Sequence, residues 1–221
     1  MSQAQPVNQL TDQEKEEGWE LLFDGSSTEH WRGYNKDQFP EKGWTVEDGL
    51  LIVQADGGGG DIITREKYGN LIFKVEWKVT KGGNSGIFYH ALEQPTQSIH
   101  WSAPEYQLLD NKHHPDAEAG KNGNHKAASL YDIIPADPQT FRGHGKWNEA
   151  KIVIEDSRVE HWLNGEKVVE YERWTPEWYE MVRNSKFRNH PAFGDMREGH
   201  IGLQDHGDRV MFRNIKIKSL D

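Results

Sequence analysis

The strongest constraint on the fold comes from residues 71–79, where apolar and other side chains alternate without interruption. The apolar set at every second position is Leu71, Phe73, Val75, Trp77 and Val79. Successive side chains of a β-strand point to opposite faces, so a period of two predicts a strand with one buried face. Such strands are typical of antiparallel sheets that pack one face on a core and expose the other.

Tight turns between short apolar runs support the same fold class. Asp48-Gly49 and Asn164-Gly165 each separate two such runs, over 44–53 and 159–171. Both residues of these dipeptides tolerate positive φ, which the favoured two-residue hairpin turn requires. We therefore expect two hairpins there, and a further short strand at 129–134 that ends before Pro135.

One segment departs from the β pattern, and we expect a short helical insertion near 175–186. Thr175 can cap such a helix, and Pro176 suits its first position. Elsewhere the nine Trp, seven Tyr, eight Phe and 22 Gly favour an all-β sandwich with many turns. We expect a flexible N-terminal tail over 1–17, with at most one helical turn at 11–17, and a single domain over 18–221.

Charge and composition exclude several classes of partner. The net charge of −10 disfavours a nucleic-acid backbone or an anionic membrane surface as partner. There is no cysteine, so disulfides and thiolate chemistry are excluded, and a metal would need His, Asp, Glu or amide ligands. No apolar run is long enough to span a membrane. The oligomeric state is left open.

Polar residues that suit a binding site gather in residues 84–110. Gly86, Phe88 and His90 would share one strand face, and Glu105 and Gln107 would share a face of the next strand. A carboxylate and an amide beside aromatic rings suit a polar, ring-shaped ligand such as a sugar. A half-exposed strand with ordinary solvated side chains remains the alternative.

Several short motifs, taken in order, resemble the 3-keto-disaccharide hydrolase family. They are Leu22-Phe23-Asp24-Gly25, Asn84-Ser85-Gly86, Glu105–Asp110, Gly145-Lys146-Trp147-Asn148, Asn164-Gly165, Gly202–Gly207 and Phe212-Arg213-Asn214-Ile215. The resemblance covers roughly 18–220. It implies a concanavalin A-like jelly roll of two antiparallel sheets, with the sugar site on the concave one. It also implies a periplasmic or secreted protein, whose signal peptide would precede the printed sequence.

The resemblance further implies cleavage of 3-keto-glycosides. A ketone at C3 acidifies the C2 proton, so the C1 substituent can leave by elimination, and water can then add. This needs a base near C2 and an electrophile on the keto oxygen, which a divalent metal ion could supply. The candidate catalytic residues are Glu105, His206, Asp110 and His114, with Glu105 and His206 also as metal ligands. The candidate substrate-binding residues are Asn84, Gln107, Tyr131, Gln204 and His90.

Two other functions stay open at this level. A non-catalytic, lectin-like carbohydrate-binding module would use the aromatic and amide side chains without titratable pairs. A glucanase with two carboxylates is disfavoured, because Gln107 and Leu109 occupy the positions two and four residues after Glu105, where related folds place a second acid.

Overall fold

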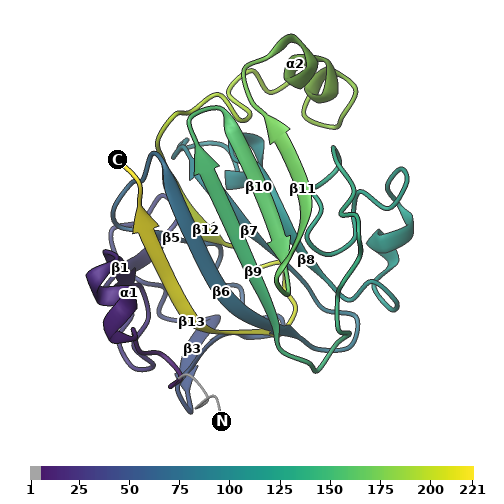
Figure 1. Ribbon diagram of the computed structural model, residues 1–221. Helices are drawn as coiled ribbons and strands as arrows, with labels where there is room; N and C mark the ends of the chain where they lie inside the picture. The colour runs from purple at the N-terminus through teal and green to yellow at the C-terminus, as the bar shows by residue number, and fades with distance from the viewer. Residues whose placement is uncertain (1–5) are drawn as a thin grey trace.

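The computed structural model describes residues 6–221, in which two antiparallel sheets pack face to face (Figure 1). The larger, eight-stranded sheet has the order β11-β10-β9-β6-β13-β4-β3, and β1 pairs with β13. Its strands are β1 Trp19–Leu21, β3 Trp44–Glu47, β4 Leu50–Val53, β6 Leu71–Val79, β9 Asn148–Glu155, β10 Arg158–Leu163, β11 Glu166–Glu172 and β13 Val210–Ser219.

The smaller, five-stranded sheet has the order β2-β5-β12-β7-β8 and lies behind the larger one in Figure 1. Its strands are β2 Trp31–Gly33, β5 Ile62–Thr64, β7 Asn84–Ala91, β8 Glu105–Leu109 and β12 His200–Leu203. At one edge of this sheet, β7 and β8 run antiparallel from the pair Phe88–Glu105 to the pair Asn84–Leu109. This is the all-β sandwich of two antiparallel sheets that the sequence predicts.

The core lies between the two sheets and follows directly from the alternation in β6. Phe73, Val75 and Trp77 are fully buried, whereas Lys74 and Glu76 on the outer face stay partly exposed. Ile87 on β7 belongs to the same core cluster from the opposite sheet. Each buried side chain of this size stabilises the fold by about 1.5–3 kcal/mol relative to exposure.

Four short helices lie outside the two sheets in the described part of the chain, namely α1 Asp12–Glu16, α2 Pro176–Arg183, and the 3₁₀ turns η1 Ile99–Trp101 and η2 Pro115–Glu118. The expected helix near 175–186 is α2, with Thr175 accepting a hydrogen bond from Trp178 N–H as its cap. No helix within residues 6–221 combines the length and the apolar character needed to cross a bilayer.

Part of the segment expected as a flexible tail over 1–17 makes hydrogen bonds to the sandwich, and its flexibility stays a prediction. Residues 1–5 of that tail lie outside the described part. Asn8 is buried, exchanges hydrogen bonds with Asn214 on β13, and donates one to the carbonyl of Gly49. The expected helical turn is α1, closed by a capping box between Thr11 and Glu14. The single domain over 18–221 stays a prediction.

Both hairpins form at the expected dipeptides, but the strand expected at 129–134 is wrong. Asp48 and Asn164 have φ of 52° and 53°, as their turns require. Within 129–134, only isolated bridges of Leu130 to Tyr106 and Ile134 occur, around a turn. Asp132 has a φ of 62° there, a left-handed conformation that interrupts the extended backbone of a regular strand.

Candidate active site

Strands β7 and β8 carry the polar residues of the site on one face. Gly86 lies directly opposite Gln107, and Phe88 lies opposite Glu105. Residues opposite each other in an antiparallel pair point to the same side of the sheet. Because neighbouring positions such as Ile87 face the core, the side chains of Glu105 and Gln107 project from the outer face of the five-stranded sheet.

A polar pocket of about 110 Å³ opens on this outer face. It is lined by Asn84, His100, Glu105, Gln107, Tyr131, Lys186, Gln204 and His206. Six of the nine residues predicted from the sequence therefore lie together, contributed by β7, β8, the turn after Leu130 and the chain after β12. The other three, Asp110, His114 and His90, are not among the residues that line the pocket.

Glu105 has the environment of a reactive carboxyl. Only 4% of the residue is exposed, and burial raises its pKa to about 8. Its carboxylate lies against the backbone of Gly86, where a β-carbon would collide with Oε1. Within residues 6–221 its carboxylate has no hydrogen-bond donor to stabilise the charge. Lys186 counteracts the rise in pKa, whereas the negative charge of Asp61 adds to it.

Two amide side chains present unpaired oxygens beside this carboxyl. Asn84 Oδ1 and Gln204 Oε1 are buried and have no hydrogen-bond partner among the described residues. Asn84 is itself 3% exposed, and its Nδ2 lies 3.4 Å from Nε2 of His206. A buried polar atom without a partner costs about 1–3 kcal/mol. Hydroxyl groups of a ligand would relieve that cost.

A hydrogen-bonded chain supports one wall of the pocket. The hydroxyl of Tyr131 donates to Asp116, whose other oxygen lies 3.0 Å from Nδ1 of His125. Nε2 of His125 lies 3.0 Å from Asp132, and Asp132 in turn accepts a hydrogen bond from Lys186 N–H. Burial opposes protonation of His125, but the two aspartates outweigh it and raise its pKa. The wall is thus a chain of charge-assisted hydrogen bonds.

Lys186 and His100 line the pocket but are absent from the set predicted from the sequence. Lys186 Nζ lies 4.1 Å from the ring centre of Tyr131, and burial lowers its pKa. Burial also lowers the pKa of His100 to about 4, which keeps its ring neutral. Trp101, next to His100, stacks on His190 of the insertion, with ring centres 3.8 Å apart. No local motif marks Lys186, because the insertion reaches the site through this stacking and through the hydrogen bond from Lys186 N–H to Asp132.

His90 has a different place from the one expected. Its backbone has a φ of 51°, next to a bulge in the pairing of β7 with β12, so the alternation of β7 ends there. Its Nε2 donates to the carbonyl of Gly69, and its Nδ1 accepts from the guanidinium of Arg173. Burial lowers its pKa to about 4. His90 therefore joins strand ends and does not reach the pocket.

Asp110 is also held elsewhere, at the end of β8. Its Oδ2 accepts hydrogen bonds from Gly82 N–H and from Nδ1 of His113, and Nδ1 of His144 lies 3.2 Å away. Burial alone would raise the pKa of Asp110, but these donors hold it below its ordinary value. Asp110 thus ties three loops together as a stable carboxylate.

His114 lies at the rim of the pocket and belongs to a group of three residues that could hold a cation. Its ring lies 6.0 Å from that of His206, edge to face, and its Nδ1 accepts from Asp116 N–H. His114, His206 and Asp208 place one ligand atom each within 4.8 Å of one another. Two imidazoles and a carboxylate suit a divalent transition-metal ion. Glu105, expected as a ligand together with His206, is not part of this group.

Fold and site together define a jelly-roll sandwich with a small, polar pocket on the outer face of its smaller sheet. The chain belongs to the family whose shared unit is described as a 3-keto-alpha-glucoside-1,2-lyase-like domain, which matches residues 18–218. The family resemblance seen in the sequence motifs is thereby confirmed.

Individual relatives agree with this assignment. A 3-keto-disaccharide hydrolase from Bacteroides thetaiotaomicron is 46% identical over 93% of this chain and 79% of its own length. A candidate glycosyl hydrolase from Parabacteroides distasonis has a crystal structure that superposes with a TM-score of 0.89, at 36% identity over 98% of this chain and all of that one. A β-glucanase from Bacillus licheniformis shares the fold, with a TM-score of 0.53 and 14% identity over 92% of this chain and 97% of its own.

These relatives settle one question left open by the sequence. The expectation of a glycoside-cleaving enzyme is confirmed at the level of the family. The lectin-like alternative is disfavoured further by the pocket, which brings Glu105, Lys186 and His206 together. A flat aromatic platform without titratable groups would have favoured the binding module.

Proposed function

We propose that this enzyme cleaves glycosides that carry a ketone at C3, by elimination followed by hydration, in the pocket around Glu105. A base removes the C2 proton, the C1–O bond breaks, and the leaving group takes up a proton. The product has a C1=C2 double bond conjugated to the ketone. Water then adds its hydroxyl to C1 and a proton to C2, so the net change is hydrolysis.

The observation that carries this proposal is the isolation of Glu105. It is the only carboxylate among the described residues that line the pocket, whereas direct glycoside hydrolysis usually requires two. A base is most effective when its pKa lies near the working pH, and burial brings the pKa of Glu105 to about 8. A single carboxyl tuned in this way suits proton transfer at a carbon next to a ketone.

The remaining residues have roles that follow from their positions. The ammonium of Lys186 is placed to stabilise negative charge that develops on the keto oxygen, since a preorganised cation in a dry site is a strong electrophile. The unpaired oxygens of Asn84 and Gln204 accept hydrogen bonds from sugar hydroxyls. Gln107 and Tyr131 complete the polar walls.

A divalent ion fits beside this pocket and is the proposed cofactor. His114, His206 and Asp208 would hold it, and when bound it would supply Lewis-acid polarisation of a substrate oxygen. The periplasmic or secreted location implied by the family resemblance is kept as a prediction.

The test compares two substrates and two solvents. The purified enzyme should cleave methyl 3-keto-glucoside but not methyl glucoside, because only the ketone acidifies C2. Run in D₂O, the reaction should place deuterium at C2 of the released sugar, while the unreacted substrate stays unlabelled at early times. Equal cleavage of both glucosides, or a product that retains hydrogen at C2, would contradict the elimination mechanism. Chelator treatment and re-addition of a divalent ion tests the cofactor separately.

A further inference from the structure

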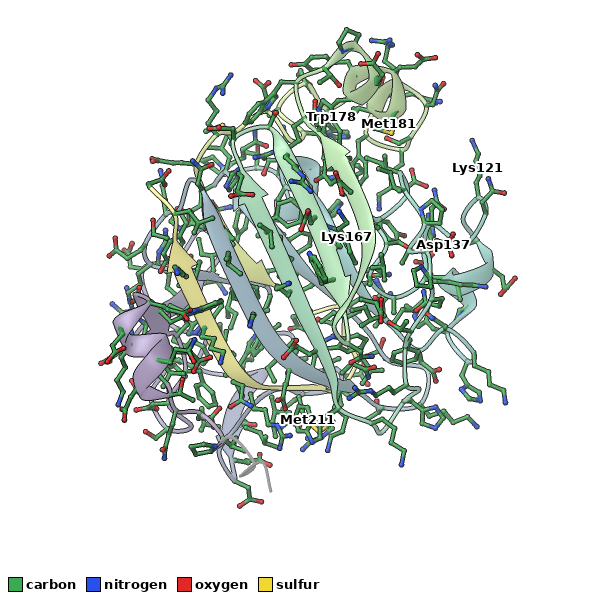
Figure 2. The ribbon with its side chains drawn as sticks, viewed as in Figure 1. Lys121, Asp137, Lys167, Trp178, Met181 and Met211 are labelled. Atoms are coloured by element: carbon green, nitrogen blue, oxygen red, sulfur yellow. The ribbon has the colours of Figure 1, made fainter. Side chains whose placement is uncertain are left out.

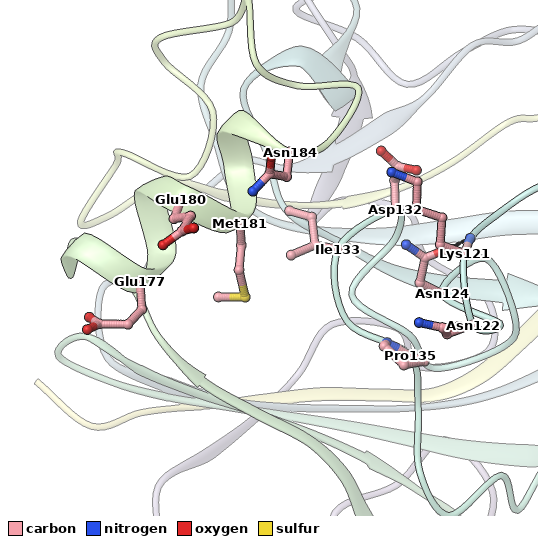
Figure 3. A pocket seen from close by; sticks show the side chains of 10 residues that line it. All are labelled: Lys121, Asn122, Asn124, Asp132, Ile133, Pro135, Glu177, Glu180, Met181 and Asn184. Atoms are coloured by element: carbon pink, nitrogen blue, oxygen red, sulfur yellow. Dashed lines mark hydrogen bonds between the residues drawn. The ribbon is translucent and has the colours of Figure 1, made fainter.

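A second, larger groove lies between the insertion helix α2 and the loop over 121–135. It encloses about 440 Å³ and is shown in Figure 3. Glu177, Glu180 and Met181 project from α2 on one side, and Lys121 and the asparagines of the loop face them from the other. Figure 2 shows the same helix, marked by Trp178 and Met181, at the end of the sandwich on the side of the loop that carries Lys121.

One more hollow adjoins both this groove and the Glu105 pocket. That hollow, also about 440 Å³, shares Lys121, Asp132 and Asn184 with the groove and shares Lys186 with the Glu105 pocket. The three spaces therefore form a row that runs outward from Glu105 along the insertion. Asp132 in the shared wall is fixed by His125 and by Lys186 N–H.

The chemistry of the groove suits sugar rings. The side chains of Glu177, Glu180 and Asn184 make no hydrogen bonds to other described residues, so their oxygens and amide are available to hydroxyl groups. Met181 and Ile133 give an apolar surface between them and pack against the core. Sugars present both hydroxyl edges and apolar C–H faces. Over the groove and the hollow next to it, three acidic residues (Glu177, Glu180 and Asp132) are balanced by three basic ones (Lys121, Lys186 and Arg188), which matches a neutral ligand better than a charged one.

The size of the Glu105 pocket makes such an extension necessary. Its volume of about 110 Å³ is a quarter of that of either neighbouring space, and ligand sites that enclose larger molecules typically measure about 300–1,000 Å³. It encloses one sugar ring at most, so further units of a glycoside have to lie outside it.

We propose that the row of spaces binds a neutral glycan on the leaving-group side, with the first unit beside Lys186 and the second between α2 and the 121–135 loop. This rests on the proposed cleavage at Glu105 and adds its substrate class, an oligosaccharide with a 3-keto unit at its non-reducing end. Contacts far from the reacting bond can raise the rate when they position that bond.

The test uses 3-keto derivatives of methyl glucoside, maltose and maltotriose, each oxidised at the non-reducing unit. The wild-type kcat/KM should rise along this series. The double variant Glu177→Ala/Glu180→Ala should lose about tenfold on the trisaccharide, the value of two lost hydrogen bonds, and change little on the methyl glucoside. Tyr179→Ala, an exposed change on the same helix, is the control and should leave the series intact.

Two outcomes separate this inference from the proposed reaction. Equal kcat/KM along the series, or an equal loss on all three substrates in the double variant, would overturn the groove assignment while leaving the reaction in place. If no keto substrate is cleaved, the reaction fails. Calorimetric binding of maltotriose, weakened in the double variant but not in Tyr179→Ala, would then support the groove independently, and unchanged binding would overturn it.

Discussion

Glu76 on the larger sheet and Glu105 on the smaller one both lie on outer faces, but they differ in burial and in hydrogen bonding. Glu76 on β6 accepts hydrogen bonds from Arg213 at 2.6 Å and from Asn214 at 2.9 Å. Glu105 on β8 is buried, has no such donor within residues 6–221, and has a raised pKa. A paired carboxylate stabilises a fold, whereas an isolated buried carboxylate destabilises it. A destabilising carboxyl group in a pocket is therefore a candidate catalytic group.

The two sheets that carry these glutamates also differ in how far their strands are buried. In the eight-stranded sheet, the neighbouring strands β6 and β9 alternate between buried and accessible residues. In the five-stranded sheet, β7, β8 and β12 are buried throughout. Its outer face is covered by the η1 turn, the 121–135 loop and the insertion. The smaller sheet therefore forms the floor of the Glu105 pocket, and the residues that line this pocket come from its strands and from loops.

The largest expected effect separates the two glutamates by substitution. Glu105→Gln should lower kcat by about 10²–10⁴-fold, the usual contribution of general base catalysis, and should leave the melting temperature unchanged or raised. Glu76→Gln should leave kcat unchanged and lower stability by about 1 kcal/mol, the loss of a charge-assisted hydrogen bond. Steady-state kinetics and thermal unfolding of both variants check this. Wild-type turnover in Glu105→Gln would remove the base from the mechanism.

A second substitution tests whether the position of Glu105 matters as much as its presence. Gly86→Ala places a methyl group against Oε1 of Glu105 and should displace the carboxylate, lowering kcat/KM by about 10–100-fold. Gly33→Ala on β2 of the same sheet meets only the flexible side chain of Lys36 and is the control. Equal activity of the two variants would show that the approach of Glu105 to the backbone has no catalytic role.

A third prediction concerns pH and the wall of the pocket. The pKa of His125 is raised in the folded protein by Asp132 and Asp116, so its contribution to stability is complete below the ordinary histidine pKa and is lost as pH rises through the raised one. The melting temperature should therefore fall by roughly 2–4 °C more between pH 6 and 9 in wild type than in His125→Asn. Parallel curves for the two proteins would contradict this.

The smallest expected effect lies on the exposed face of the larger sheet. Lys151 Nζ lies 3.6 Å from the ring centre of Trp162, a cation–π contact near the surface. Lys151→Gln should cost about 0.5–1 kcal/mol and leave kinetics unchanged. A change in kcat/KM on any keto substrate would show that the exposed face of the larger sheet influences catalysis at the smaller one, and would contradict this prediction.

The same contrast explains how much could be predicted from the sequence. Some patterns are local signals, because each depends only on the conformation of its own residues. These are the alternation over 71–79 and the turn dipeptides at 48–49 and 164–165. Glu105, Gln107 and Asn84 could be found since they follow the strand period on β7 and β8. The hairpin and helix positions were predictable for the same reason.

The residues that escaped prediction depend on contacts distant in the sequence. Lys186 reaches the pocket because the insertion packs on η1 and bonds Asp132, and no local pattern encodes that contact. His90 leaves its expected face because a bulge gives it a positive φ. Asp110 is held by His113 and His144, and His144 comes from a loop far along the chain.

The most direct test measures the ionisation of Glu105 itself. In protein labelled with ¹³C at the glutamate side-chain carboxyl, the NMR signal missing from Glu105→Gln identifies this residue. We expect that signal to titrate near pH 8, as burial without hydrogen-bond donors requires. Titration in the ordinary range of a glutamate, near pH 4.3 to about a unit either side, would show that burial does not raise the pKa of Glu105, and would contradict its role as the base.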